Sequence, residues 1–423
     1  MEQQQQKDKM TRLEKRWVLY DVGNSAFTLL ISTILPIYFN GLAESAGLSD
    51  AQYLAFWGYA ASFVTVVVAV LGPTLGAIAD LPDMKKKLFT LCVAVGVIGC
   101  AVMGALSSWV WFLGCFIIAK IGYSASLVFY DSMLTDVTTP ERMDKVSAVG
   151  YAFGYAGSCI PFVVSLVIVL GYEAIGLTLG AAMLIAFLIN AGWWLCCTLP
   201  LLARYRQKYS IPAEGHMVAG AFRRLGETFR DIQGNKQVLW FLIAFFLYID
   251  GVYTIIDMAT AYGQALGLDS TGLLLALLVT QIVAFPFALL FGWLSRRVDT
   301  ALLVSIAIVA YIGIAAYAIF LRSQTQFWIL AVWVGMFQGG IQSLSRSYFG
   351  KIIPPEKSGE YYGLLDICGK GASFVGTFLV SLMTQISGST SVGVMVIAPL
   401  ILLGFLAFRK AVREGRKANA SEV

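Results

Sequence analysis

Residues 300–321 read TALLVSIAIVAYIGIAAYAIFL, a run of 22 residues without a charged side chain. A helix rises about 1.5 Å per residue, so this run is long enough to cross the roughly 30 Å hydrocarbon core of a bilayer. The run is continuous, whereas the strands of a membrane barrel alternate apolar and polar residues in pieces of about 10. The stretch therefore predicts a transmembrane α-helix.

The composition of the whole chain agrees with a membrane protein. Of its 423 residues, 58% are hydrophobic and 13% are charged, and the mean hydropathy is +0.75. A soluble protein has about a quarter of its residues charged, and one with this composition would expose large apolar patches. The net charge of +5 does not indicate a nucleic-acid partner, because the Lys and Arg residues lie in short gaps between apolar runs. The expected partner is the lipid bilayer.

Twelve apolar runs divide the chain into two halves. We expect spans near residues 17–40, 52–80, 87–107, 109–137, 143–170, 173–200, 237–265, 270–295, 300–322, 326–350, 358–387 and 389–410. The predicted organisation is an N-terminal tail (1–16), a six-helix half (17–200), a linker (201–235), a second six-helix half (236–410) and a C-terminal tail (411–423). The linker is either a solvated connector or an amphipathic helix on the membrane surface.

The distribution of Lys and Arg predicts the orientation. The two tails and the gaps after even-numbered spans hold 27 of the 30 basic residues, and the opposite gaps hold only Arg322. Positive charge accumulates on the cytoplasmic side of membrane proteins. We therefore expect a multi-pass protein of the cell membrane, the inner membrane where there are two, with both termini cytoplasmic.

Cysteine and histidine usage narrows the chemistry. The seven cysteines lie inside apolar runs, so we expect small buried side chains and no disulfide framework. The only histidine, His216, lies in the linker, which leaves no histidine-based metal site or nucleophile–histidine pair. No Gly-rich phosphate-binding loop is present. We expect no metal, no cofactor and no enzymatic activity.

An internal repeat predicts the fold. A shift of 215 positions places residues 111–157 on 326–372, with Pro140 on Pro355, Glu141 on Glu356 and Gly154 on Gly369. A parallel repeat of six-helix halves is typical of the major facilitator architecture. The predicted fold class is an all-α membrane protein of twelve transmembrane helices in two halves related by pseudo-two-fold symmetry.

Two loops agree with that fold. Residues 72–80 read GPTLGAIAD and precede three lysines, as in the facilitator signature loop, where glycine allows close helix approach and the acid pins helix ends. We therefore expect Asp80 to belong to a gate. The corresponding loop after span 8 has Ser295 where an acid would be expected.

Three stretches carry a resemblance to a known family. They read WVLYDVGNSAF (residues 17–27), GYAFGYAGS (150–158) and QSLSRSYFGKIIPPEKSGEYYGLLDICGKGASFVG (342–376). These stretches resemble the "unknown major facilitator" family of bacteria, which is related to the vacuolar amino-acid effluxers of fungi. The resemblance covers nearly the whole chain and implies a transporter of the facilitator fold. By analogy with the fungal branch, it also implies amino-acid export.

Charged residues within the spans point to a central site. Lys120, Asp250 and Lys370 each fall roughly 16–20 Å from one end of their helix, near the membrane midplane where transporters bind substrate. Charges at this depth usually face a cavity or an ionic partner. The alternative is structural: each lysine is neutralised by a nearby acid and holds helices together.

Helical spacing extends this site along several spans, although aromatic residues at such spacing are often simple packing. The candidate substrate-binding residues are Asn24, Lys120, Tyr123, Tyr151, Tyr155, Asp250, Tyr253, Gln338, Gln342 and Lys370.

The mixture of ammonium and carboxylate groups suits a zwitterion such as an amino acid, or a small organic anion. Asp21, Asp250 and Asp366 are candidates for proton coupling, because a desolvated carboxylate beside a cation can titrate during transport. A uniporter with static ion pairs is the alternative. The competing functions are export of lipophilic drugs or lysolipids, and a membrane sensor that binds without translocating. A monomer is expected.

The repeat also predicts a cytoplasmic gate. Asp131 and Arg346 occupy equivalent positions, each nine residues before the turn proline. Rocking of the two halves should bring these helix ends together when the cavity opens outward. The alternative is local pairing of Asp131 with Arg142 or Lys145, and of Arg346 with lipid headgroups or Glu356.

Overall fold

The computed structural model describes residues 9–212 and 217–421, so His216 and the start of the N-terminal tail lie outside the described residues. Twelve of its helices are long and apolar enough to cross a membrane. The predicted count of spans is therefore confirmed.

The N-terminal half contains six spans. Its helices are α2 (Arg12–Ser32), α3 (Ile34–Ser45), α4 (Asp50–Ala79), α5 (Met84–Met103), α6 (Trp109–Ser132), α7 (Leu134–Val137), α8 (Met143–Leu170) and α9 (Leu179–Arg204). The pair α2 and α3 forms the first span, and α6 with α7 forms the fourth.

The linker contains helix α10 (Met217–Gly234), and the C-terminal half follows it. The helices of that half are α11 (Lys236–Ala265), α12 (Ser270–Leu294), α13 (Thr300–Ile319), α14 (Gln324–Ile352), α15 (Ser358–Ser387), α16 (Thr390–Met395) and α17 (Ile397–Ser421). A short 3₁₀ turn, Pro355–Lys357, joins α14 to α15.

The first and last spans are each interrupted, although the sequence pattern predicted continuous runs. The first breaks at Thr33, and the last breaks at Val396. In both cases a proline, Pro36 or Pro399, is the third residue of the next helix. Proline lacks the N–H that would bond to the carbonyl four residues earlier, and its ring crowds that carbonyl. The interruption follows from this local chemistry.

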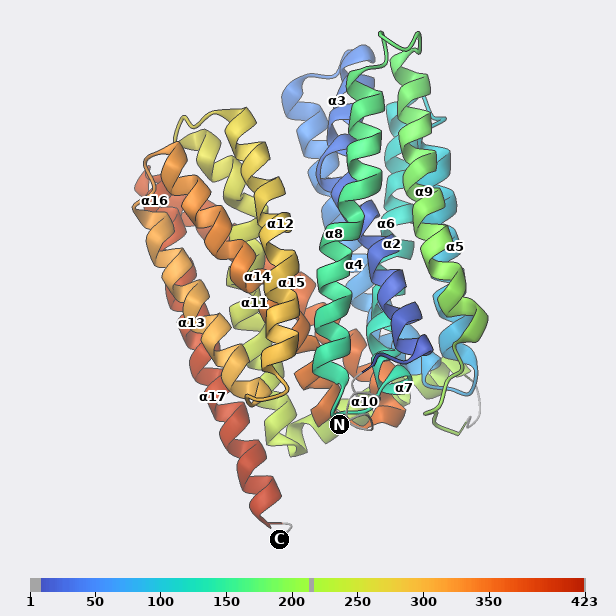
Figure 1. Ribbon diagram of the computed structural model, residues 1–423, viewed down its shortest axis with the longest axis vertical. Coiled ribbons are helices and arrows are strands. Elements are labelled where there is room, and N and C mark those ends of the chain that lie inside the picture. The colour runs from blue at the N-terminus through green and yellow to red at the C-terminus, as the bar shows by residue number, and fades with distance from the viewer. Residues whose placement is uncertain (1–8, 213–216, 422–423) are drawn as a thin grey trace.

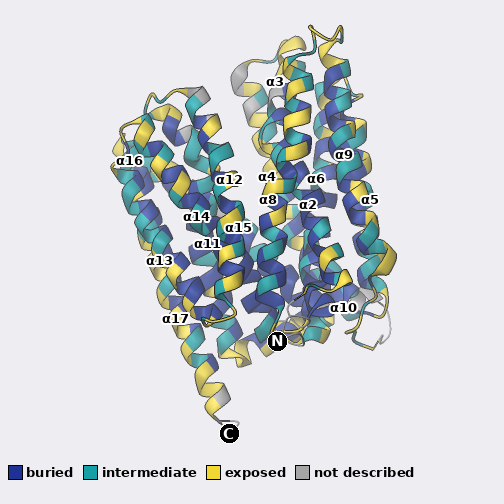
Figure 2. Cartoon of the chain, viewed as in Figure 1, coloured by how far each residue is buried: buried dark blue, intermediate teal, exposed yellow. Residues whose placement is uncertain are grey.

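The two halves stand side by side, and both termini lie at one end of the bundle, here called the terminal end (Figure 1). Helix α10 crosses this end, and α17 extends beyond it (Figure 1). The halves meet mainly along α4 against α15 and along α8 against α12 and α14. Each half has its own core of buried apolar side chains. Many exposed large apolar residues cover the outer faces, as expected of helices that contact lipid (Figure 2).

Glycines set the distance between α4 and α15. A Cβ atom added to Gly76 would lie 2.2 Å from the carbonyl oxygen of Gly359, and one added to Gly363 would lie 2.8 Å from that of Gly72. These are two pairs of glycines four residues apart, a spacing that lets helix backbones touch in membranes. The glycines of the signature loop thus bring the two halves into backbone contact.

Candidate functional site

A buried guanidinium joins the two halves near the terminal end. Arg346 of α14 is only 5% exposed, yet it carries a full charge. Its Nη1 donates to Asp131 Oδ1 at 3.0 Å, and its Nη2 lies 3.5 Å from Asp21 Oδ2. Its Nε and Nη2 also donate to the hydroxyl and the carbonyl of Ser147. Every one of these partners belongs to the N-terminal half.

Aromatic rings surround the same guanidinium. Its central carbon lies 4.7 Å from the ring centre of Trp17, 5.4 Å from that of Tyr130 and 4.4 Å from that of Tyr151. Aromatic faces attract cations, most strongly where water is excluded. A Cβ atom at Gly150 would lie 3.3 Å from Arg346 Nη2 and 2.8 Å from Asp21 Oδ2, so glycine leaves room for this cluster.

A second inter-half cluster surrounds Asp144, in the first turn of α8. Its carboxylate accepts from Ser347 at 2.6 Å, from Lys351 Nζ at 2.5 Å and from Thr300 at 2.6 Å. All three donors lie in the C-terminal half. Sequence reasoning missed this cluster. The available signal was the repeat, since Lys351 is the counterpart of Asp136, another buried ionisable residue.

A third cluster surrounds Asp80 at the end of α4. Its carboxylate accepts from the backbone N–H groups of Gly359 at 2.8 Å and Glu360 at 2.9 Å, the first residues of α15. These groups carry partial positive charge at a helix N-terminus. Burial raises the pKa of Asp80 to about 7, against the lowering effects of Lys85 and of the two N–H groups. Lys85 Nζ bonds to Asp136 at 3.2 Å and to Ser358 at 2.9 Å.

The loop after α12, which corresponds to the loop after α4, has Ser295 in place of the acid; the acid at this contact comes from the opposite half. Ser295 donates to the carbonyl of Gly292 within its own loop and does not pin the other half. Instead Asp144, on the opposite half, reaches Thr300 at the start of α13. The acid thus lies on α8 in one contact and at the end of α4 in the other.

The pairing of Asp131 with Arg142, one form of the local alternative, is not seen in this structure. Arg142 pairs with Glu14 at 2.7 Å, and Asp131 pairs with Arg346. Glu14 also caps the first turn of α2 through the backbone N–H of Thr11, so Arg142 fastens the start of the first span. This competition for Arg142 was not visible in the sequence.

Above these clusters lies a polar middle layer. Lys370 Nζ bonds to Asp366 Oδ2 at 2.5 Å, and the two side chains remain 24% and 17% exposed. The ammonium of Lys120 lies 5.1 Å from the ring centre of Tyr123 and interacts electrostatically with Lys370 and Asp257. Two lysines, one from each half, therefore contribute to one electrostatic environment.

Tyrosines and a glutamine border this layer. The hydroxyl of Tyr155 donates to Gln342 Oε1 at 2.9 Å across the halves. The rings of Tyr151 and Tyr155 lie 6.1 Å apart. Tyr253 packs toward Gly369 of α15, which lies one residue before Lys370. The structure brings these predicted residues together.

Other predicted residues make their hydrogen bonds within one half. Asn24 donates to the carbonyl of Tyr20 in its own helix and is buried. The hydroxyl of Tyr123 bonds to Thr28 at 2.6 Å, and its ring packs on Phe27 and Trp194 in the core of the N-terminal half. Asp250 is fully buried, where it accepts from the backbone N–H of Gly376 on α15.

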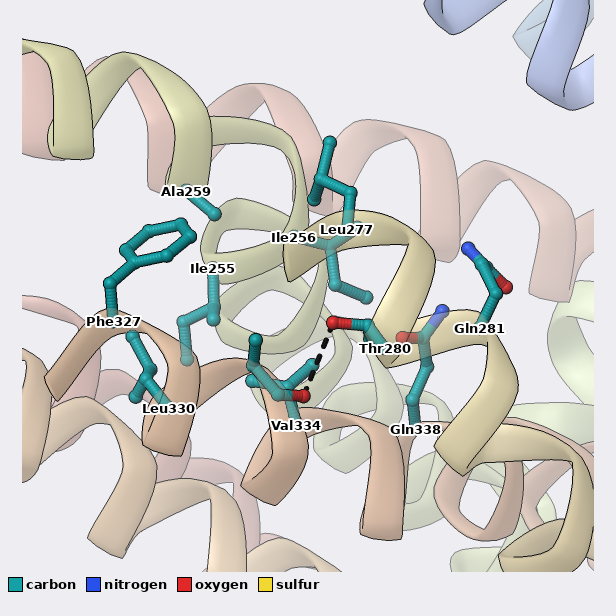
Figure 3. Close-up of a pocket in the computed structure, with 11 residues that line it drawn as sticks. Ile255, Ile256, Ala259, Leu277, Thr280, Gln281, Phe327, Leu330, Val334 and Gln338 are labelled. Carbon is teal, nitrogen blue, oxygen red and sulfur yellow. Dashed lines mark hydrogen bonds between the residues drawn. The ribbon is translucent and has the colours of Figure 1, made fainter. Parts of the chain in front are cut away.

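Gln338 lines a separate cavity within the C-terminal half. The cavity has a volume of about 50 Å³ and lies between α11, α12 and α14 (Figure 3). Its wall is mostly aliphatic, with Thr280, Gln281 and Gln338 as the polar members (Figure 3). The hydroxyl of Thr280 donates to the carbonyl groups of Ala276 and Ala331. This cavity lacks the charged groups of the middle layer.

Metal and thiol chemistry find little support in the parts of the chain that are described. Within residues 9–212 and 217–421, no group of three or more His, Cys, Asp or Glu side chains is placed to hold a metal ion. The seven cysteines are free thiols. Only Cys100 and Cys197 are buried, Cys196 is exposed and the other four are partly exposed, so the expectation of buried cysteines is wrong for five of the seven.

The family follows from comparison with known proteins. A family model described as "Vacuole effluxer Atg22 like" matches residues 11–421. The chain belongs to this family. The "Uncharacterized MFS-type transporter YxiO" of Bacillus subtilis (strain 168) is 40% identical over 403 residues, which cover 94% of each chain. Autophagy-related protein 22 of Saccharomyces cerevisiae (strain ATCC 204508 / S288c) is 23% identical over 402 residues, which cover 82% of this chain and 75% of that protein. The predicted relationship to the fungal effluxers is confirmed.

Solved structures establish the fold of this Atg22-like transporter. The human organic anion transporter MFSD10 superposes with a TM-score of 0.68 at 15% identity, over 94% of this chain and 99% of that one. A bacterial homologue of the iron transporter ferroportin, in an outward-facing state, gives 0.67 at 16% identity, over 95% and 98%. The predicted major facilitator fold is confirmed.

Proposed function

We propose that this transporter moves a small solute that carries a carboxylate, an amino acid or a related organic anion, by alternating access. The observation that carries the proposal is that each half contributes one partly exposed lysine to the polar middle layer: Lys120 beside the ring of Tyr123, and Lys370 paired with Asp366. Ammonium groups at this depth are costly unless they serve a cavity or a partner. A carboxylate bound between the two lysines would join the halves electrostatically.

The relatives support this class of solute. The family is described as a vacuole effluxer family, and one structural neighbour is described as an organic anion transporter. Asp366, which holds Lys370 in this state, would release it when the solute's carboxylate arrives. Tyr151, Tyr155, Tyr253 and Gln342 supply hydroxyl and amide groups that can orient the rest of the solute.

In this proposal the structure represents an outward-facing state in the cell membrane. Positive charge on the side of the tails makes the terminal end cytoplasmic. The clusters of Asp80, Asp144 and Arg346 all join the halves at that end. They would form the cytoplasmic gate and would part when the transporter opens inward.

Binding to the purified protein tests the solute class. A thermal-shift screen of the proteinogenic L-amino acids and small dicarboxylates should find at least one that stabilises the wild-type protein. Lys120→Gln and Lys370→Gln should each abolish that shift while the protein stays folded, because both lysines are partly exposed and glutamine keeps a polar side chain there. Lys410→Gln is the matched control, since Lys410 is exposed and lies over Trp240 at the terminal end.

A specific observation favours one competing solute class. The aliphatic cavity of Figure 3 would accept part of a lipophilic solute. Stabilisation by lysolipids or lipophilic cations that persists in both lysine variants would overturn the carboxylate proposal in favour of this class.

A further inference from the structure

One buried carboxylate differs from all the others described. Asp250 lies in the middle of α11 with 0% exposure. Its Oδ1 accepts from Gly376 N at 2.8 Å and from the hydroxyl of Thr254 at 3.5 Å. Its Oδ2 is buried and has no hydrogen-bond partner. A Cβ atom at Gly376 would lie 2.5 Å from Oδ1, so the carboxyl group presses directly on the backbone of α15.

No cation faces this group in the described part of the chain. On α15 the charged side chains are Glu360, Asp366 and Lys370; Glu360 lies in the first turn and pairs with Arg224, and the other two bond to each other. The side chains of α17 opposite Gly251, the neighbour of Asp250, are Ile397 and Ile401. Helices α12 and α13 contain no charged residue, and Arg346 and Lys351 of α14 are bonded to acids of the N-terminal half. The next acid on α11, Asp257, is exposed and interacts with Lys120.

The other buried or partly buried acids of the described spans and their ends each have a basic partner. Glu14 has Arg142, and Glu360 has Arg224. Asp21 and Asp131 share Arg346, Asp144 has Lys351, and Asp366 has Lys370. Asp80 and Asp136 share Lys85. An ionised carboxylate that is buried without a cation carries a large desolvation cost, and a bound proton removes it. A metal cation needs several oxygen ligands, whereas the side chains around Asp250 offer one carboxylate and one hydroxyl.

We propose that Asp250 is the proton-binding site that couples transport to a proton gradient. The proposal rests on the proposed transport function and distinguishes Asp250 from Asp21 and Asp366. In the packed state the proton stays on Asp250, because the seam between α11 and α15 excludes water. Release of the proton requires water to reach the carboxyl group, and therefore requires α15 to move away from α11. Since α15 also carries Lys370, this movement links the proton to the solute site.

Infrared spectroscopy tests the proton without any solute. Asp80, whose pKa is about 7, contributes a partial carboxyl band at pH 7. Beside it, the full chain in lipid should show a C=O stretching band of a second protonated carboxyl group, which Asp250→Asn removes. Asp21→Asn and Asp366→Asn are the matched controls and should keep the band. Persistence of the band in Asp250→Asn overturns the proposal. Thermal unfolding and gel filtration identify a variant that fails to fold. If Asp250→Asn does not fold, Asp250→Glu is measured in its place. A carboxyl band at the same frequency in Asp250→Glu and in the wild type then overturns the proposal.

Flux measurements test the coupling. Proteoliposomes receive a mixture of labelled proteinogenic L-amino acids, with and without a pH gradient. Asp250→Asn should retain solute exchange within about twofold of wild type and lose all gradient-driven accumulation. Accumulation that follows pH in the variant, or that follows Na⁺ in the wild type, overturns the proton site. Absence of any flux in the wild type instead overturns the proposed solute class, provided that the infrared band has identified Asp250 as protonated.

Discussion

At the scale of single residues, the burial of Arg346 depends on the groups that compensate its charge. Burial of a guanidinium is costly, and the cost is offset by two carboxylates, two acceptors on Ser147 and three aromatic faces. All of these come from the opposite half. The same residue therefore stabilises the closed terminal end when the halves meet, and it must find water or another partner when they part.

A charge swap tests whether Asp131 and Arg346 act as a gate pair. Asp131→Arg and Arg346→Asp should each reduce amino-acid flux in proteoliposomes by at least tenfold, because each leaves like charges in the interface. The double variant should recover part of the loss, with a coupling energy of about 1–3 kcal/mol. Losses that simply add would mean that the two residues act separately.

The pH dependence of stability tests the burial of Asp80. Its pKa rises from 3.8 to about 7 in the folded protein, mainly through burial. The folded protein thus binds this proton more tightly than the unfolded chain does. The stabilisation is complete below about pH 4 and is lost as pH rises to about 7. In thermal unfolding between these pH values, Asp80→Asn should lack that part of the decline. Identical pH profiles would contradict the assignment.

At the scale of helices, α4 and α15 pack through glycine, and this contact closes the terminal end. Gly76 and Gly359 allow the two backbones to touch, and Asp80 then reaches the first N–H groups of α15. Helix α10 adds a bridge. Arg224 donates to the carbonyl of Ala77 on α4, and Thr228 bonds to Glu360 on α15. Helix α10 of the linker therefore fastens both halves.

A side chain at Gly76 should prevent this closure. Gly76→Val places a Cβ atom 2.2 Å from a backbone oxygen that cannot move alone, so the closed terminal end should lose its stability. Spin labels on the terminal ends of α4 and α15 should report a longer distance. Gly58→Val on the same helix is the matched control, because a Cβ atom there meets nothing within 4 Å. Equal distances in the two variants would contradict the packing argument.

At the scale of the whole molecule, three polar clusters close one end together. The Asp80 cluster joins α4 to α15, whereas the Asp144 and Arg346 clusters adjoin each other on α8 and α14. Rigid halves that rock against each other must break all three in one movement. Weakening any one cluster should therefore shift the entire protein toward the opposite state.

Cysteine labelling tests this concerted opening. Ala148 is fully buried against Gly292 of α12, so a cysteine there is shielded while the end is closed. In a background without native cysteines, Asp144→Asn should raise the labelling rate of Ala148→Cys from the terminal side about tenfold, since charge-assisted hydrogen bonds contribute roughly 1.5–3 kcal/mol. Lys87→Cys, which is exposed, should label at the same rate with or without Asp144→Asn. No change at Ala148→Cys would mean that the Asp144 cluster does not control opening.

The sequence alone determined the architecture, because each relevant signal is local or periodic. Apolar runs longer than 18 residues require membrane helices, and the 215-residue repeat requires two similar halves. The glycines at 72 and 76 and the position of Asp80 could also be recognised, because close approach and charge at a helix end leave marks within a few residues.

Only the tertiary structure decided which charges meet. Arg142 had Asp131 nearby in sequence but pairs with Glu14, and Asp144 finds Lys351 about 200 residues away. Tyr123 shares a helical face with Lys120, yet its hydroxyl is taken by Thr28. The isolation of Asp250 could not be predicted either, because a buried carboxylate is identified by what surrounds it in three dimensions. Side-chain ionic contacts depend on the distances between helices. The periodicity of a sequence shows which residues share a helix face, but it does not show how far that face lies from another helix.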